Sequence, residues 1–316
     1  MLAHDQRDAR ARGLSVRVGI ALPRAPRSAG DLWELVDALE GIGYDSVWLS
    51  DTATQPGLAP LATLAAIAAS TQRLKLGTSV LTLPPRNPVL LARELATVDF
   101  ISGGRLLPAG GLGVDAPVER DALGTARDEL VGRLEEGIEV IRRLWTGKPV
   151  TFAGRFCTLT DVTLHPQPAR RRLEVWLGGR APVALRRIGR IGDGWLGSFV
   201  GHDEFAAATD VIRAAAAGAG RAIDEDHYGT IVVCAATPED AAAAGYPGRL
   251  RGIRRDAPIE ESFAIGAEAA LRLLEGFVAA GASKFVVVPV ARDLPGWLQV
   301  LFDDVVRPIE AGRDAA

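Results

Sequence analysis

Asp51 and the small residues around Thr78 are the positions where residue type and spacing most readily serve ligand binding. Asp51 directly follows the apolar stretch Ser46–Ser50, which is typical of a strand, so its carboxylate lies at a strand's carboxyl end. There it would accept hydrogen bonds from a ligand hydroxyl, or it would only cap the next helix. Gly77, Thr78 and Ser79 end a second apolar strand, and their small side chains would let a flat ligand lie against the backbone. A merely well-packed strand would explain the same three residues.

Two glycine-containing segments offer a second kind of chemistry, the close approach of a ligand to the backbone, and the second of them suits a phosphate. Gly110 and Gly111 end the expected fourth strand. Gly178, Gly179 and Arg180 join the expected fifth strand to a helix. Glycines let the backbone approach a ligand closely, and the free amides of a helix N-terminus bind phosphate. Ordinary turn chemistry is the alternative, and among the nearby arginines we take only Arg180 as a candidate.

Composition narrows the class of protein. The chain has 316 residues, of which 48% are hydrophobic and 24% are charged, enough to bury a large core in a single domain. Its net charge of -3 argues against a nucleic-acid or membrane-surface binder, because such proteins usually carry a basic excess or a basic stripe. No apolar run approaches the roughly 20 residues that span a bilayer. We therefore expect a small-molecule ligand, no nucleic acid and no membrane partner.

Cysteine and histidine usage bears on compartment and metal binding. Cys157 and Cys234 lie far apart and form no CxxC pair, which fits a reducing cytoplasm better than a disulfide framework. The histidines show no ligand spacing such as HxxxH, so we expect no protein-bound metal. The chemistry must then come from another source.

Expected strands and helices alternate along the whole chain. The strands are expected at residues 16–22, 46–50, 74–82, 105–111, 173–177, 194–198, 229–236 and 284–290. The helices are expected from about residue 31, at 58–70, from 88, at 126–145, from 182, and at 203–217, 267–280 and 297–309. Several strands are uninterrupted apolar runs, which is typical of a parallel sheet covered by helices.

The region 146–172 departs from this alternation. Two β-prone stretches there flank a glycine turn at 153–155, a pattern that predicts a β-hairpin. We therefore predict an α/β fold, a (β/α)8 TIM barrel with a β-hairpin insertion before the fifth strand. Residues 1–13 are mixed charged and polar and are expected to form a disordered tail, so that residues 14–316 make up a single barrel domain.

Short segments of the chain, taken together, resemble the luciferase-like monooxygenase superfamily of flavin and deazaflavin barrels. They occur in the family's order over most of residues 16–200. The matching segments are Gly43–Trp48, Leu76–Val80, Arg86–Pro88, Ser102–Arg105, Val175–Gly179 and Asp193–Trp195. The branch that the chain resembles most consists of coenzyme F420-dependent oxidoreductases of unassigned substrate.

The resemblance implies a set of cofactor-binding residues and assigns no catalytic residue. Ser79 and Val80 would be joined by a non-prolyl cis peptide bond that supports the flat ring of the cofactor. Asp51 would contact the cofactor, and the turn at Gly178 would meet its phosphate. The full candidate set is Asp51, Thr78, Ser79, Val80, Gly110, Gly111, Gly178, Gly179 and Arg180.

The sequence departs from the sugar-phosphate dehydrogenases of the superfamily, in which a histidine follows the strand-two aspartate and a glutamate follows the strand-four glycines. Thr52 and Val114 occupy those positions here, and neither can act as a general acid or base near neutral pH. A sugar-phosphate substrate is therefore in doubt. The proton donor would be solvent or a residue not yet identified.

The expected activity is hydride transfer between coenzyme F420 and a small organic substrate, with the cofactor supplying the chemistry and the protein supplying orientation. An FMN-dependent luciferase-like monooxygenase and a cofactor-binding protein without turnover are the alternatives. F420 carries an anionic tail beyond its phosphate, so Arg180 with Arg186 or Arg187 would form a basic rim for it. By analogy with the superfamily, we also expect a homodimer.

Overall fold

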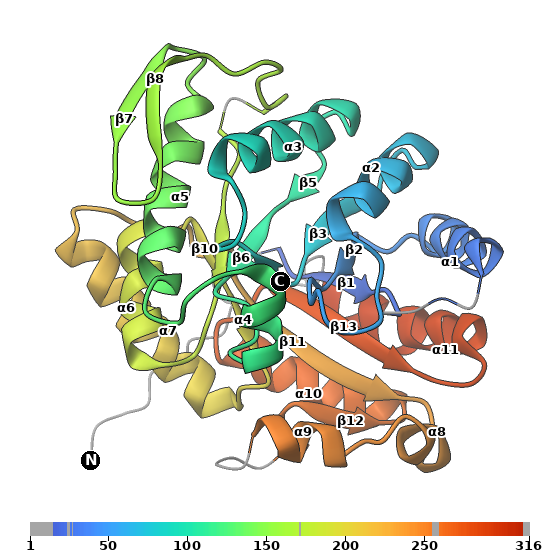
Figure 1. The fold of residues 1–316 in the computed structure, drawn as a ribbon. Coiled ribbons are helices and arrows are strands. Elements are labelled where there is room, and N and C mark those ends of the chain that lie inside the picture. Colours follow the sequence, from blue (N-terminus) through green and yellow to red (C-terminus); the bar gives the residue numbers. More distant parts are fainter. Residues whose placement is uncertain (1–14, 24–25, 27, 171, 255–258, 312–316) are drawn as a thin grey trace, which may run out of the picture. The chain divides into compact units, whose positions relative to one another are not determined.

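The computed structural model (Figure 1) describes residues 15–23, 26, 28–170, 172–254 and 259–311. The expected tail at residues 1–13 lies outside the described residues. The chain divides into two compact units. Unit 1 contains Met1–Leu22, Trp33–Val47 and Gly179–Ala316, and unit 2 contains Pro23–Leu32 and Trp48–Gly178. Helix α1 (Ala29–Ile42) and strand β2 (Ser46–Leu49) each include residues of both units.

Unit 2 alternates short parallel strands with longer helices. Strand β3 pairs with β5, β4 with β6, and β6 with β9, all in parallel. These strands are β3 (Lys75–Thr78), β4 (Leu81–Thr82), β5 (Leu106–Leu107), β6 (Ala109–Gly111) and β9 (Trp176–Gly178). The helices are α2 (Pro60–Ser70), α3 (Pro88–Ile101), α4 (Pro117–Leu123) and α5 (Leu130–Leu144). Parallel strands need such crossover connections, so the predicted strand–helix alternation holds here.

A separate antiparallel pair, β7 (Val150–Ala153) and β8 (Thr158–Val162), lies in unit 2 where the sequence predicts a β-hairpin. Figure 1 shows this pair beside α5. The carboxylate of Glu136 in α5 accepts hydrogen bonds from the amides of Arg155 and Phe156, each at 2.8 Å. The turn between the two strands is therefore anchored to α5.

Unit 1 contains four neighbouring parallel strands in the order β10, β11, β13 and β1, with β12 pairing with the second half of β11. The strands are β1 (Arg17–Ala21), β10 (Gly194–Ser198), β11 (Tyr228–Ala235), β12 (Phe263–Ile265) and β13 (Lys284–Val290). The helices are α6 (Pro182–Ile191), α7 (His202–Gly218), α8 (Pro238–Ala243), α9 (Gly248–Ile253), a 3-10 turn (Ile259–Glu261), α10 (Ala267–Ala279), α11 (Leu294–Leu301) and α12 (Arg307–Ala311). Every residue of β11 is buried, as expected of a strand covered on both faces.

Helix α3 begins as the sequence predicts. The side chain of Asn87 accepts hydrogen bonds from the amides of Val89 and Leu90 at 2.9 and 3.1 Å, and Pro88 occupies the first turn. The apolar positions that follow at helical spacing are buried. The predicted cap and the predicted buried face are therefore both confirmed.

Aromatic side chains fill the core of unit 1. Trp195 of β10 stacks on Phe205 of α7 with ring centroids 4.9 Å apart, and Phe205 meets Phe277 of α10 edge-on at 5.7 Å. Trp195 and Phe277 are 0% exposed. These rings join the sheet to two of the helices that cover it.

Several predicted elements differ in extent from the observed ones, most clearly the fourth strand and the helices expected at 126–145 and 297–309. Pro108 divides the expected fourth strand into β5 and β6, because proline has no amide to donate to the strand ladder. The helix expected at 126–145 begins only at Leu130, and the separate helix α4 precedes it. The last helix consists of α11, a π-helical turn at Phe302–Val306, and α12. Helices α4, α8 and α9 are absent from the sequence prediction.

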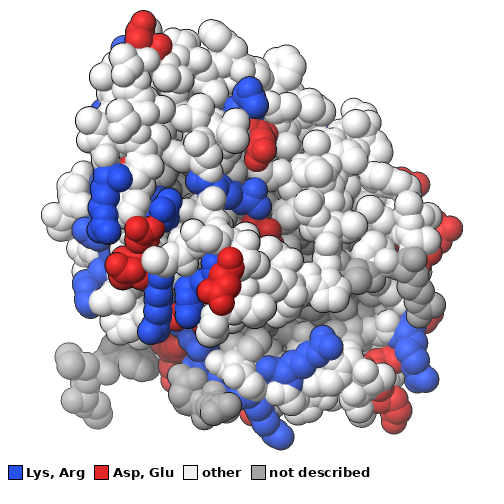
Figure 2. All heavy atoms as spheres, viewed as in Figure 1, with Lys and Arg blue, Asp and Glu red and all other residues white. Residues whose placement is uncertain are grey.

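Among the described residues, no helix is both long enough and apolar enough to cross a membrane. On the face seen in Figure 2, basic and acidic side chains are intermixed. Within unit 2, Arg120 and Arg127 both form ion pairs with Asp115, and Arg133 pairs with Glu129.

Candidate functional site

Gly77 lies against the indole ring of Trp48 in unit 2. A Cβ atom at position 77 would lie 2.2 Å from two ring atoms of Trp48, far inside van der Waals contact. The flat group that packs against the backbone at Gly77 is therefore the indole ring of Trp48 and not a ligand. For Gly77 the alternative of a well-packed strand is correct, and the residues that follow it remain candidates.

The peptide bond between Ser79 and Val80 is cis, as the family resemblance implies. It lies between β3 and β4, so the expected third strand is divided at this point. The amide of Ser79 donates to the carbonyl of Leu49 at 2.7 Å, which ties the bend to the end of β2. Both residues of the cis bond are half-buried, so each keeps some accessible surface.

Gly111 and Gly178 lie near Val80 at the carboxyl ends of β6 and β9. A Cβ atom at position 111 would lie 3.0 Å from Val80 Cγ2 and 3.9 Å from the carbonyl oxygen of Gly178. Gly110 differs, because a Cβ atom there would lie 2.5 Å from the side chain of Leu83. The fold thus brings Val80, Gly111 and Gly178 together, whereas the missing side chain of Gly110 makes room for Leu83.

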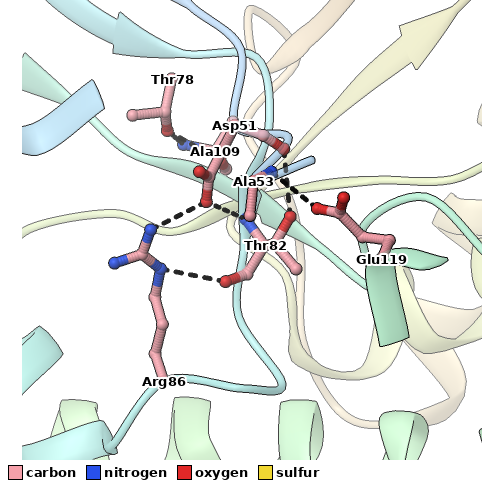
Figure 3. Close-up of polar contacts among 7 residues, drawn as sticks. All are labelled: Asp51, Ala53, Thr78, Thr82, Arg86, Ala109 and Glu119. Carbon is pink, nitrogen blue, oxygen red and sulfur yellow. Dashed lines mark hydrogen bonds and ion pairs between the residues drawn. The ribbon is translucent and has the colours of Figure 1, made fainter. Parts of the chain in front are cut away.

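The carboxylate of Asp51 joins the end of β2 to the segment that follows the cis bond (Figure 3). Its Oδ2 atom accepts hydrogen bonds from Thr82 N and from Arg86 Nη2, both at 2.9 Å. Arg86 Nε also donates to Thr82 O at 3.1 Å. Within the described residues, the other carboxylate oxygen, Oδ1, makes no hydrogen bond. Asp51 is therefore fixed through one oxygen, and a ligand contact of Asp51 stays a prediction.

Thr78 uses its side chain inside the sheet (Figure 3). Its hydroxyl donates to Ala109 O at 2.7 Å and accepts from Ala109 N at 2.9 Å, and the residue is fully buried. This pair of bonds joins β3 to β6 directly after the break at Pro108. The hydroxyl is committed to the sheet, so a cofactor contact of Thr78 stays a prediction.

Glu119 of α4 is a residue that the sequence analysis does not identify (Figure 3). Its carboxylate accepts hydrogen bonds from the amide of Ala53 at 2.7 Å and from the amide and the hydroxyl of Thr54. Burial alone would raise the pKa of Glu119, but these hydrogen bonds outweigh it and hold that pKa below its usual range. The ionised carboxylate is therefore a clamp on the loop after Asp51. Val114, at the expected glutamate position, is 48% exposed.

Gly179 and Arg180 belong to unit 1, directly before α6. Gly179 has a φ of 140°, a conformation that favours glycine, and its carbonyl accepts a hydrogen bond from Trp195 Nε1 at 2.8 Å. Arg180 is exposed and donates from Nη2 to the carbonyl of Ile253 at 3.1 Å. Helix α6 begins without a side-chain cap, but Pro182 has no N–H and the amide of Ala184 already donates to Ala181 O at 2.8 Å. The Val183 amide, which makes no hydrogen bond within the described residues, is the first-turn donor that can bind an anion.

The basic side chains near Arg180 differ from those that the sequence analysis expects. Arg186 is exposed, but Arg187 is buried and has an interaction partner, so it forms no part of an exposed rim. Helix α9, whose last residue accepts the hydrogen bond from Arg180, contributes the exposed side chains of Arg249 and Arg251. The exposed arginines of this region therefore come from α6 and α9.

Arg86 and Glu119 are the residues of this site that the sequence analysis misses. Arg86 lies 35 positions from Asp51, and Glu119 lies 66 positions from Ala53, so no local pattern connects the partners. Two signals were present. Arg86 is part of a family-like segment, and Pro117 is typical of a first helical turn, which would have placed Glu119 on a helix.

A family model described as luciferase-like monooxygenase matches residues 14–275. The chain belongs to the luciferase-like monooxygenase family. The six short family-like segments between residues 43 and 195 lie inside the matched range, whereas the family-like ending at residues 281–286 lies beyond it. The resemblance that they carry is therefore confirmed for the larger part of the chain.

Curated relatives of this luciferase-like protein are F420-dependent glucose-6-phosphate dehydrogenases. The protein of Nakamurella multipartita is 35% identical over 192 residues, which cover 57% of this chain and 56% of the relative. The protein of Amycolatopsis mediterranei is 36% identical over 176 residues, which cover 52% of each chain. The chain thus spans about half the length of the curated relatives that it matches.

Solved structures share the fold over nearly the whole chain. An F420-dependent secondary alcohol dehydrogenase in complex with an F420-acetone adduct is 20% identical, with a TM-score of 0.80 and coverage of 93% of this chain and 99% of that chain. An F420-dependent tetrahydromethanopterin reductase from Methanopyrus kandleri is 20% identical, with a TM-score of 0.74 and the same coverage, 93% and 99%. A monooxygenase from Streptomyces bottropensis is 22% identical, with a TM-score of 0.79 and coverage of 93% and 99%. These likenesses confirm the predicted (β/α)8 barrel.

Proposed function

We propose that this protein is a coenzyme F420-dependent oxidoreductase that transfers a hydride between the deazaflavin and a small organic substrate. The observation that carries the proposal is the grouping, within unit 2, of the side chain of Val80, the adjacent backbone of Gly111 and the Asp51 carboxylate, whose Oδ1 atom makes no hydrogen bond among the described residues. Family membership and the F420-dependent relatives support the same reading.

The residues of unit 2 fit a flat ring. Gly111 and Gly178 carry no side chain, and the space that a Cβ atom would fill at position 111 lies directly beside Val80. A cofactor ring could therefore rest on Val80 without meeting a side chain at either glycine. In this proposal Asp51 Oδ1 accepts a hydrogen bond from the cofactor. Because an ionised carboxylate can only accept hydrogen bonds, the cofactor group at this position must be a donor.

The residues of unit 1 near Gly179 fit an anionic group. We propose that Gly179, Arg180 and the Val183 amide in the first turn of α6 bind the phosphate, because a helix-terminal amide and a guanidinium favour a phosphate oxyanion. The exposed Arg249 and Arg251 of α9 would bind the carboxylates of the F420 tail. FMN ends at its phosphate and would leave these two arginines without a ligand.

When bound, F420 supplies the hydride chemistry, and the residues of the chain bind and orient the reactants. The carboxylate of Glu119 is ionised and engaged by three hydrogen bonds, so it does not donate a proton at neutral pH. Thr52 and Val114 cannot do so either. We therefore propose solvent as the proton source, and we do not extend the proposal to glucose 6-phosphate, the substrate named for the relatives.

The organisation of the protein follows from the same proposal. We propose that residues 14–316 act as one luciferase-like domain and that the protein is a homodimer in the cytoplasm. Both cysteines are free thiols, which supports a reducing compartment.

The test of the proposed function is a comparison of cofactors on the same purified protein. Mass and absorbance spectra identify any cofactor that is released on unfolding, and titrations with F420 and FMN at low and high ionic strength then give the affinities. We expect F420 to bind more tightly than FMN, with a preference that shrinks as salt screens the anionic tail. Tighter binding of FMN at both salt concentrations would support the monooxygenase instead, and binding of neither would support a protein without turnover.

A variant pair locates the basic rim. Arg249→Ala should weaken binding of F420 more than binding of FMN, because only F420 has carboxylates beyond the phosphate. Arg93→Ala, an exposed arginine of α3 in unit 2, should leave both affinities unchanged. Equal losses for F420 and FMN in Arg249→Ala would show that α9 does not bind the tail.

A further inference from the structure

Arg86 connects the candidate site with a groove on the outside of unit 2. Its side chain is 31% exposed, and it lines a groove of about 450 Å³ together with residues of α2 and α3. The same guanidinium donates from Nη2 to Asp51 Oδ2 at 2.9 Å and from Nε to Thr82 O at 3.1 Å. One side chain therefore contacts both the groove and the Asp51 carboxylate.

The hydrogen bonds to Asp51 determine which of its oxygens is available. Both bonds that fix the carboxylate, from Thr82 N and from Arg86 Nη2, end on Oδ2. A single backbone amide would still let the carboxylate turn about its last torsion and exchange its two oxygens. The second bond comes from a planar group that is itself held by Thr82 O, so it removes this freedom. The side chain of Asp51 is 13% exposed, which leaves little room for water to take over the same task.

We propose that Arg86 is a positioning residue, which locks Asp51 through Oδ2 and so presents Oδ1 to a hydrogen-bond donor of the ligand. The contact between Oδ1 and the cofactor rests on the proposed function, whereas the lock itself does not. Figure 3 shows the arrangement, in which the two bonds of Arg86 leave from different nitrogens of one guanidinium. A lysine can supply the charge at this position but not both bonds in fixed geometry.

Two other roles for Arg86 make different predictions. A cation that binds the ligand directly would act independently of Asp51. A simple surface ion pair would contribute a little to stability and nothing to the site. The experiments must therefore show whether Asp51 Oδ2 still accepts its hydrogen bonds. They must also show whether the effect of replacing Arg86 depends on the presence of Asp51.

The first measurement needs no ligand. Amide exchange of Thr82, followed by NMR, reports whether Asp51 Oδ2 still accepts the Thr82 amide proton. We expect Arg86→Ala to speed this exchange by about tenfold and Arg86→Lys to speed it less, because a hydrogen bond to a charged acceptor is lost in part or in full. Arg93→Ala is the matched control, since Arg93 lines the same groove but has no hydrogen bond or ion pair to Asp51. Unchanged exchange in both Arg86 variants would overturn the lock.

The second measurement is a double-mutant cycle for F420 affinity with Asp51→Asn and Arg86→Ala. If Arg86 acts through Asp51, its replacement should weaken binding by about tenfold in the wild-type background and by less than about twofold in the Asp51→Asn background. Equal losses in both backgrounds would show that Arg86 contacts the ligand itself and would overturn the proposal. A wild-type protein that binds no F420 would refute the proposed function, and the Thr82 exchange would still decide the lock.

The groove offers a third, chemical readout. Because Arg86 reaches the groove, free guanidinium ions should enter the space left by Arg86→Ala and restore slow exchange of the Thr82 amide. Ammonium ions at the same concentration should restore it less, since they lack the two parallel donors. Equal effects of the two ions would mean that only charge is needed, which contradicts the lock.

Discussion

The indole ring of Trp48 occupies the space that a side chain at position 77 would need. A Cβ atom there would lie 2.2 Å from the ring, and Trp48 is 2% exposed, so the ring has no free space into which to move. Gly77→Ala should therefore lower the free energy of unfolding by at least about 1–3 kcal/mol, the usual cost of overpacking. Chemical denaturation measures this loss.

The control for this prediction is Gly137→Ala in α5 of the same unit. The nearest atom to a Cβ atom at position 137 is Pro88 Cβ at 4.0 Å, which is ordinary contact. Alanine also favours a helix over glycine by up to about 1 kcal/mol, so this variant should be as stable as the wild type or more stable. A Gly77→Ala variant that matches Gly137→Ala would contradict the packing described for Trp48.

Trp195→Phe tests how the core of unit 1 holds the turn at Gly179, for which we propose phosphate binding. It removes the hydrogen bond from Trp195 Nε1 to Gly179 O, which measures 2.8 Å, and keeps an aromatic ring in the core. We expect a loss of about 1 kcal/mol in unfolding free energy and a several-fold loss of affinity for F420. The matched control is Trp297→Phe, which removes a similar bond from Trp297 Nε1 to Cys234 O at 3.0 Å. That control should lose stability without losing affinity.

Glu119→Gln tests the clamp on the loop after Asp51. The pKa of Glu119 lies below its ordinary value of 4.5 in the folded protein, so the ionised form contributes stability above pH 4.5 that is lost as the pH falls through the folded pKa. The wild type should therefore lose stability more steeply than Glu119→Gln below pH 4.5. At pH 7 the variant should be less stable by about 1–2 kcal/mol, because an amide accepts hydrogen bonds more weakly. Urea denaturation across this pH range measures both effects.

Glu310→Gln should show the opposite pH dependence. Burial raises the pKa of Glu310 above its ordinary value of 4.5, although the Val18 amide donates a hydrogen bond to its Oε1 atom at 2.9 Å. The folded protein then holds this proton longer than the unfolded chain, so the wild type loses stability as the pH rises from 4.5 through the folded pKa. Glutamine keeps an acceptor for Val18 and has no proton to lose. Relative to the wild type, Glu310→Gln should gain stability between pH 4 and pH 7, and a parallel decline of the two proteins would contradict the raised pKa.

The sequence alone predicted the bounds of those strands and helices that start and end at local signals such as turns and helix caps. The observed bounds of β10 and β13 equal the predicted ones, because both are apolar runs that start after a turn. Helix α3 was predicted from the cap at Asn87 and the first-turn proline. The helices α8 and α9 have only six residues each, too few for an apolar period to appear.

The local structure of the candidate site was predictable where it depends on a residue's own backbone, and less so where it depends on a distant partner. The cis bond at Ser79 and Val80 and the turn at Gly179 are properties of short segments, and the family-like residues indicated them. The sequence allowed Gly77 to be either a ligand contact or a packing position, because the Trp48 ring that covers it belongs to another strand. The pairing of Arg86 with Asp51 depends on how two loops meet, which no local pattern encodes.

The engagement of Glu119 with the loop at Ala53 and Thr54 has a stereochemical consequence. A fixed acid beside a substrate would deliver its proton to one face of the reacting carbon, but this carboxylate is ionised and faces the protein's own amides. A proton drawn from water has no assigned face. We therefore expect the hydride to be added to one face of its acceptor carbon. Any proton on an adjacent carbon should be added from both faces. Reactions in heavy water should then yield a mixture of labelled diastereomers.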